Sequence, residues 1–332
     1  MTQDAALVPI PTVQRKAAIV HAAARDYTGS VSVKPIDPFD LNRTIFNTLE
    51  GAIPRMVMQS RIAKEPTWRQ NVARDIDGQY QTLAEQEPLP EVDPLLLRFL
   101  KEECDFDVEH ADGSFLDHLY FCYEYSIHHY PTQSALVMLL HSILGTGTNT
   151  FAMEAHKIPT LKSLMPEFDW GHVSAFPSML RLLYDMKLRR ELRDNMHRLG
   201  DLDGIRLHRV IDNKSLEMSA EDFWIQLNYQ LIHLVDFLPV SNWTIHANET
   251  AFIVFRDLYD LLQRAGRLEA KLNYTPASGP RRLQDEKLTL VGWLASWIPV
   301  PIGEKMAASS IHRFSSRIGH SMDYELLWRT GA

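Results

Sequence analysis

Ionisable residues inside long apolar stretches are the feature that most restricts how this 332-residue chain can fold. His141 lies in the apolar run 133–144, and Asp236 lies in the apolar run 231–238. A polar group buried in an apolar core needs a hydrogen-bond partner or a metal ion, because burial removes its water. The fold must therefore bring partners to these side chains.

Local signals predict a helix at each of two histidines. The hydroxyl-then-carboxylate spacing that begins at Ser114 is typical of a capping box, so we expect a helix from there with His118 near its first turn. The run 133–144 is apolar nearly all round, which predicts a buried helix that ends at Gly145. An antiparallel pair of these helices would bring the imidazoles of His118 and His141 together.

These residue types suit a metal site. Neutral imidazole binds zinc, iron and similar ions, and a carboxylate adds an oxygen ligand, so we predict His118, His141 and Asp236 as metal ligands. The alternative is a metal-free network in which the two imidazoles bond to Asp236 or to backbone carbonyls. His110 precedes the first helix and is either a further ligand, a group that orients a ligand, a proton-transfer residue or an exposed histidine.

The order of these motifs resembles the HD superfamily, which comprises all-helical metal-dependent phosphohydrolases and di-iron oxygenases. HD enzymes carry His-Asp at the second motif, where this chain has His141-Ser142, so the resemblance is partial. A closer resemblance is to an HD-like domain family without an assigned activity, over residues 109–243. The residues that match its pattern are His110, His118, Leu119, His141, Ser142, Gly145, Thr146, Asp236 and Phe237.

The resemblance implies an all-α fold with an HD-like helical core and additional N- and C-terminal helices. It also gives candidate positions but no reaction, and at these positions we predict a catalytic role for His110 and a substrate pocket lined by Ser142 and Thr146. His156 and His172 fall where binuclear HD enzymes carry extra ligands, but no local motif surrounds them. We therefore expect these two histidines to be surface or packing residues.

Composition narrows the class of protein. A net charge of −8 provides no overall basic surface for nucleic acid. Two cysteines, Cys104 and Cys122, imply no disulfide framework, so a reducing cytoplasmic environment is expected. We expect neither secretion nor a membrane span, because the sequence shows no signal pattern and no apolar run of about 18 residues or more.

Turn and periodicity signals divide the chain into four parts. We expect a loosely packed segment at 1–38, a helical layer at 39–93, the HD-like core at 94–274 and a helical extension at 275–332. The apolar stretch 288–301 is expected to cover the core as a helix. Further helices are predicted at 94–101, 166–187, 220–238 and 249–273, with connections at 200–213, 239–247 and 275–280.

Three classes of function fit these patterns. The first is a metal-dependent hydrolase of phosphoesters or related small molecules, with iron, zinc or manganese as cofactor and proton transfer by His110. The second is an iron-dependent oxygenase of the HD type. The third is a non-catalytic binding or interaction protein in which the same residues form a structural network.

Overall fold

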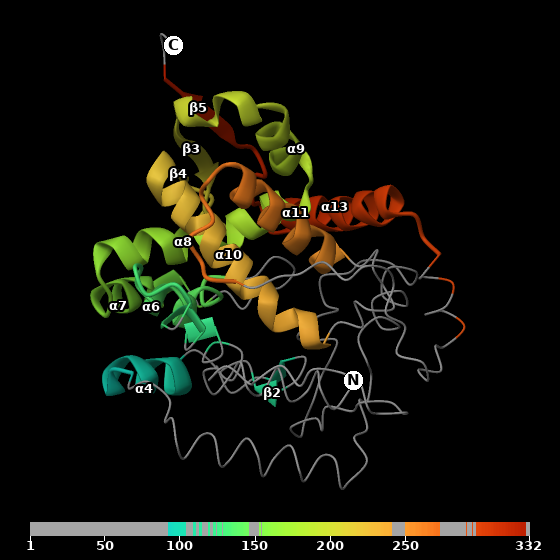
Figure 1. The fold of residues 1–332 in the computed structure, drawn as a ribbon. Coiled ribbons are helices and arrows are strands. Elements are labelled where there is room, and N and C mark those ends of the chain that lie inside the picture. The colour runs from blue at the N-terminus through green and yellow to red at the C-terminus, as the bar shows by residue number, and fades with distance from the viewer. Residues whose placement is uncertain are drawn as a thin grey trace, which may run out of the picture.

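The protein is mostly helical with one small sheet (Figure 1). In the part of the chain that the structure describes, 64% of residues are helical and 9% are in strands, so helices dominate but the fold is not purely α. The computed structural model describes residues 92–103, 109–110, 113–114, 119, 122–123, 125–127, 129–145, 153, 155–240, 250–272, 290, 294 and 297–329.

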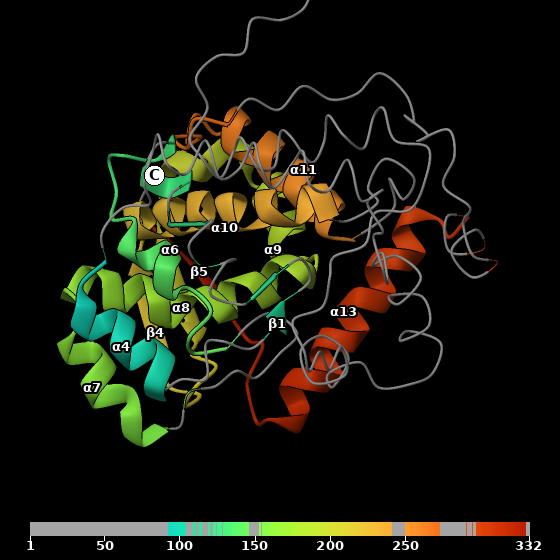
Figure 2. The same cartoon turned by 90° about the horizontal axis from the view of Figure 1, so that it is seen from below.

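Two long buried helices, α8 (Glu167–Tyr184) and α10 (Ala220–Val240), lie at the centre (Figures 1 and 2). α8 contacts α6, α9 and α13, whereas α10 contacts α11 and two strands of the sheet. This arrangement makes the seam between α8 and α10 the middle of the core. The other helices are α4 (Pro94–Glu103), α6 (Leu136–Leu140), α7 (Ile158–Ser163), α9 (Lys187–Asp194), α11 (Thr250–Arg264) and α13 (Val300–Arg317), with 3-10 turns η2 (Ala155–Lys157) and η3 (Met196–Asp201).

Local chemistry explains where α10 begins. The hydroxyl of Ser219 accepts a hydrogen bond from the backbone N–H of Asp222 at 3.1 Å and donates one to its carboxylate at 2.7 Å. A residue in this capping position satisfies one of the unpaired N–H groups of the first turn. The helix predicted at 220–238 therefore starts at the predicted residue and continues to Val240.

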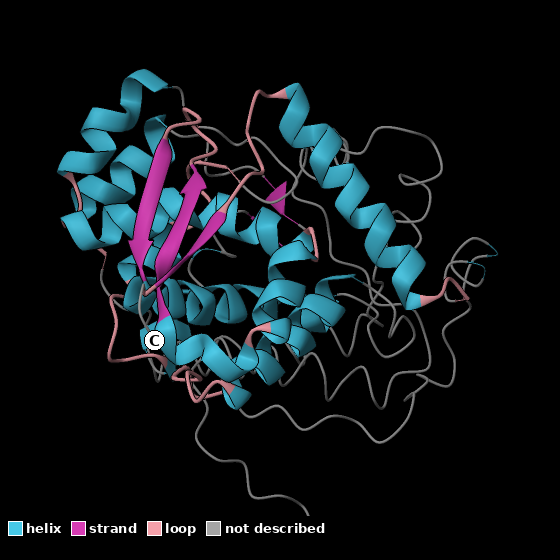
Figure 3. Cartoon of the chain, turned by 90° about the horizontal axis from the view of Figure 1, so that it is seen from above, coloured by secondary structure: helices cyan, strands magenta, loops and turns pink. Residues whose placement is uncertain are grey.

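A three-stranded antiparallel sheet packs against the helices, in the order β4-β3-β5 (Figure 3). In the central strand Ile205 stands opposite Met218 and Leu326. Gly204 lies so close to its neighbour that a Cβ there would sit 2.2 Å from the carbonyl oxygen of Met218. The strands are β3 (Leu202–His208), β4 (Ser215–Ser219) and β5 (Glu325–Trp328).

The prediction of a mere connection at 200–213 is wrong, because β3 occupies half of it. Its side chains at Leu202, Ile205 and Leu207 are buried, and this pattern does not alternate regularly. The strand is central and is held by partners on both sides, one of which is about 120 residues away in sequence. Such pairing leaves no local signal.

The expected helix start at Ser114 is only partly tested, because residues 115–118 lie outside the described residues. Glu109–His110 (β1) pairs antiparallel with Gly113–Ser114 (β2), so Ser114 lies in a strand opposite Glu109. Among the described residues that follow, helical backbone occurs at 119, 122–123, 125–127 and 129.

The helix predicted at 133–144 is shorter than expected. Helical structure α6 covers only Leu136–Leu140, and turns follow up to Gly145, which has a φ of 122°. In these turns the N–H of Ile143 donates to Leu140 and the N–H of Gly145 donates to Ser142, at 3.0 and 3.1 Å. These tighter bonds end the helix early and place His141 at its C-cap.

At the C-terminal end, α13 covers the core with buried Ala308, Ile311 and Phe314. The sequence predicted this core-covering helix at an earlier position in the chain, at 288–301. Two described residues of that stretch, Leu290 and Trp297, are 72% and 71% exposed, so they do not cover the core. No helix among the described segments has the length and apolarity that crossing a bilayer would require. The predicted segments 1–38 and most of 39–93 lie outside the described residues.

Candidate metal centre

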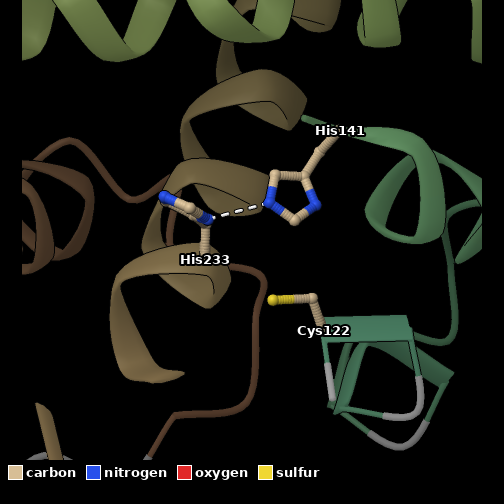
Figure 4. Close-up of side chains that lie close together, drawn as sticks. All are labelled: Cys122, His141 and His233. Atoms are coloured by element: carbon tan, nitrogen blue, oxygen red, sulfur yellow. Dashed lines mark hydrogen bonds between the residues drawn. The ribbon is translucent and has the colours of Figure 1, made fainter. Parts of the chain in front are cut away.

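Three side chains of metal-ligating type converge in the core: Cys122, His141 and His233 (Figure 4). Cys122 lies in helical backbone, His141 comes from the C-cap of α6, and His233 from the second half of α10. One ligand atom from each lies within 4.8 Å of the other two. All three are buried, with exposed fractions of 0%, 0% and 5%.

Hydrogen bonds define which nitrogen of each histidine carries a proton. His141 Nδ1 lies 2.6 Å from the carbonyl oxygen of Met138, and a carbonyl only accepts, so Nδ1 is the donor. The Nε2 of His141 then presents a lone pair, which accepts a hydrogen bond from His233 Nδ1 at 2.9 Å. A backbone carbonyl that holds one imidazole N–H while the other nitrogen faces inward is the usual arrangement around a metal-binding histidine.

The surroundings of the two imidazoles are apolar. The ring of Phe176 on α8 lies 4.7 Å from the His141 ring and 5.4 Å from the His233 ring, measured between centroids. The two imidazoles themselves meet edge to face at 4.7 Å. In such a dry site a charged thiolate is costly unless a cation balances it, and an ion bound to all three groups would do so.

The donor set fits a four-coordinate transition metal. Tetrahedral zinc, bound at about 2.0 to 2.3 Å, would hold its sulfur and nitrogen ligands roughly 3.3 to 3.7 Å from one another. The spacings in the cluster, from 2.9 Å between the nitrogens to at most 4.8 Å, lie on either side of that range. Small side-chain rotations would bring all three into coordination, and three protein ligands leave one position open.

Of the metal ligands predicted from sequence, His141 is part of this cluster. Asp236 lies in α10 three positions after His233, but its side chain is not among those described. His118 lies outside the described residues altogether. The predictions for His118 and Asp236 therefore stay predictions.

The other predicted site residues are only partly placed. His110 lies in β1 opposite Gly113, and its side chain is not described. Ser142 is 1% exposed and directly follows the ligand His141, whereas Thr146 lies outside the described residues. His156 is exposed, and His172 is 2% exposed and packs between α8 and α10.

Sequence reasoning missed Cys122 and His233, although a signal for both was present. Cys122 follows His118 by four positions and His233 precedes Asp236 by three, which are the spacings of one helical face. The expectation for the cysteines concerns only disulfides, and the expectation for the run 231–238 concerns only its carboxylate. A search for ligand types at helical spacing would have found both.

Comparisons of the chain with protein-family models, with curated protein sequences and with solved structures give no match. The chemistry of the centre itself therefore carries the functional argument.

Proposed function

We propose that this protein binds a metal ion through Cys122, His141 and His233 and acts as a metal-dependent hydrolase. The observation that carries the proposal is the convergence, in full burial, of three ligand-type side chains from three separate segments. Binding energy from an ion would offset the cost of ordering and desolvating these groups. It would also explain why a thiol and two imidazoles share one apolar site.

The ligand types favour zinc among the candidate ions. A thiolate with two imidazoles suits zinc, whereas manganese prefers oxygen ligands and the mononuclear iron oxygenases use two histidines with a carboxylate. A zinc ion held by three protein ligands supplies Lewis-acid chemistry at its open position, as in hydrolases. A phosphoester or related small molecule is the substrate class that the HD resemblance adds to this proposal.

The remaining predicted residues have defined roles within this proposal. His118 and Asp236, at helical spacing from Cys122 and His233, are candidates for a fourth ligand or for a group that orients one. His110 is the candidate for proton transfer to or from the substrate.

Metal content tests the proposal directly. We expect about one zinc per chain in protein purified without chelators or a metal-binding tag, measured by elemental mass spectrometry. Cys122→Ser, His141→Ala and His233→Ala should lose the metal, whereas His156→Ala, which changes an exposed histidine, should keep it. Circular dichroism checks that each variant folds. A metal-free parent after reconstitution with zinc would refute the proposal.

One observation favours a second function, that of a non-catalytic binding module. The 2.9 Å hydrogen bond between His141 and His233 satisfies both facing nitrogens without any ion. A network of this kind stabilises packing and needs no metal. The module is supported if the parent binds no zinc and has the same melting temperature with and without chelator.

A further inference from the structure

Large apolar side chains are exposed close together near the C-terminal end of the chain. Leu290, Leu294 and Trp297 are 72%, 54% and 71% exposed, and Ile302 at the start of α13 is 52% exposed. These four are a majority of the exposed large apolar side chains in the described part of the chain. Such clustering is a mark of an interaction surface, whereas single exposed apolar residues are ordinary.

Backbone hydrogen bonds hold these side chains in helical turns. Leu290 and Leu294 have helical backbone, and the N–H of Trp297 donates to the carbonyl of Leu294 at 3.2 Å. Intervals of four and three residues place the three side chains on one helical side. Pro299 then caps α13, and the N–H of Ile302 donates to its carbonyl at 2.9 Å. The apolar side chains therefore project from ordered turns.

The inner side of α13 uses the negative charge of this helix. Oε1 of Glu304 lies 2.7 Å from the guanidinium of Arg189, and the Glu304 side chain is 13% exposed. Nε2 of His312 lies 2.6 Å from Oδ1 of Asp185, on the same inner side. Glu304 is the single carboxylate in α13, all of whose residues are described. The outer side of α13 therefore has no carboxylate.

The outer side of α13 continues the exposed apolar residues as a cationic stripe. Ile302, Lys305, Ser309 and Arg313 are all exposed and follow one another at intervals of three, four and four residues. Nε of Arg313 donates to the carbonyl of Ser309 at 3.4 Å, which holds the guanidinium along this side. Arg317 adds a further exposed cation at the end of the helix. This local positive charge stands out in a chain with a net charge of −8.

α13 lies along the outside of the described helices, and its N-terminal end projects past them (Figures 1 and 3). A flat charged layer with an apolar interior can therefore approach this end. We use the name docking face for six exposed residues at this position: Leu290, Leu294, Trp297, Ile302, Lys305 and Arg313.

We propose that the docking face binds the surface of a bilayer that contains anionic lipid. Helical segments that lie in a membrane interface combine tryptophan and aliphatic residues with lysine and arginine, as this face does. The apolar side chains enter the headgroup region, and the two cations meet the lipid phosphates and carboxylates. A protein partner fits less well, because the apolar anchors of protein interfaces fill pockets. The inference does not rest on the metal centre.

Vesicle sedimentation tests the proposal. We expect the parent to sediment with vesicles of phosphatidylcholine and phosphatidylserine at about 7:3, to bind pure phosphatidylcholine vesicles at least about tenfold more weakly, and to dissociate as salt is added. Each interfacial cation contributes roughly fivefold, so the double variant Lys305→Glu/Arg313→Glu should lose more than about 25-fold in partitioning. Trp297→Ser should lose about tenfold.

Matched controls come from exposed residues of other helices. Arg98→Glu/Arg264→Glu lowers the net charge by the same amount as the double variant, at side chains 71% and 68% exposed on α4 and α11. Leu95→Ser removes an apolar side chain that is 65% exposed on α4. Both controls should keep parental binding. Circular dichroism checks that every variant folds.

Three results would overturn the proposal: a parent that ignores the mixed vesicles, a parent that binds both vesicle types equally, or controls that lose as much as the docking-face variants. Light scattering after size exclusion examines the remaining occupant, a second copy of the chain. A dimer that Trp297→Ser dissociates, without vesicle binding by the parent, would assign the face to that copy. Zinc chelation should leave sedimentation unchanged, so failure of the metal centre and failure of the docking face are distinguishable.

Discussion

Two buried polar clusters in this protein differ in how their polar groups find partners. In the cluster at α9, α11 and α13, the guanidinium of Arg189 is 1% exposed and pairs with Asp257 and, at 2.7 Å, with Glu304. Its Nε donates to the carbonyl of Leu183 at 2.7 Å. Here every buried charge meets an opposite charge, so the cluster is complete without a ligand.

The metal centre differs in the kind of groups it brings together. Cys122, His141 and His233 all offer lone pairs to a cation, and none of the three carries a fixed positive charge. The comparison teaches how to distinguish the two. A buried cluster of opposite charges indicates a structural junction, whereas a buried cluster of Lewis bases indicates a site for an ion.

The largest expected effect comes from breaking the cluster formed by Arg189, Asp257 and Glu304, which we call the charge cluster. Arg189→Met would leave Glu304 without its cation and Asp257 with Arg193 alone, and we expect a loss of about 3 to 5 kcal/mol in the free energy of unfolding. Urea denaturation measures it. Arg193→Ala removes a partner of Asp257 that is 43% exposed and should cost no more than about 1 kcal/mol. Equal losses of unfolding free energy in the two variants would contradict the conclusion that the buried Arg189 holds the charge cluster together.

Zinc should raise the stability of the protein through the candidate metal centre, and changes in the charge cluster should not alter that gain. An ion that binds only the folded state adds about 2.7 kcal/mol at one hundred times its dissociation constant. We expect that gain in the parent and in Arg193→Ala, and none in His141→Ala, when thermal unfolding is followed with and without zinc. A gain in His141→Ala would show that the ion binds elsewhere.

A fourth buried histidine, His320, predicts a pH effect unrelated to metal. Burial lowers the pKa of His320 from 6.5 to about 4, and its Nε2 lies 2.9 Å from the carbonyl of His208. The unfolded chain therefore binds more protons between these pH values, so stability falls as the pH drops from 6.5 toward 4. The loss is at most about 3 kcal/mol, because one pKa unit corresponds to about 1.4 kcal/mol.

Denaturation of the parent and of His320→Gln across this pH range isolates that contribution. The glutamine variant should lose stability less steeply from pH 6.5 to 4, since it has no imidazole to protonate. Parallel curves for the two proteins would show that His320 keeps an ordinary pKa. Zinc should be absent from both samples, because acid also weakens metal binding.

The smallest effect is expected at an exposed version of the charge cluster. Arg206, whose side chain is 44% exposed, pairs with Glu217 at 3.0 Å and with Glu325 at 2.6 Å across the sheet. Water screens such pairs, so Arg206→Ala should cost about 0.5 to 1 kcal/mol in urea denaturation. A cost like that of Arg189→Met would show that burial does not separate the two networks.

Local signals predicted much of the helical structure. The helices expected at 94–101 and 220–238 appear as α4 and α10, because an apolar pattern and a defined start act within a few turns. The strand β3 was missed because it is held by partners elsewhere in the chain. The predicted end of α6 was wrong because tight turns replace the helix after Leu140, and no residue in the sequence signals that change.

The sequence by itself determined that a polar residue would be buried in this core, since His141 stands in a run too apolar to stay in water. It also supplied ligand types at helical spacing. Only the tertiary structure decided that Cys122 and His233 meet His141, because the packing of α6 against α8 and of α8 against α10 sets which side chains share one site. Convergence of this kind depends on contacts between distant segments, which no local pattern records.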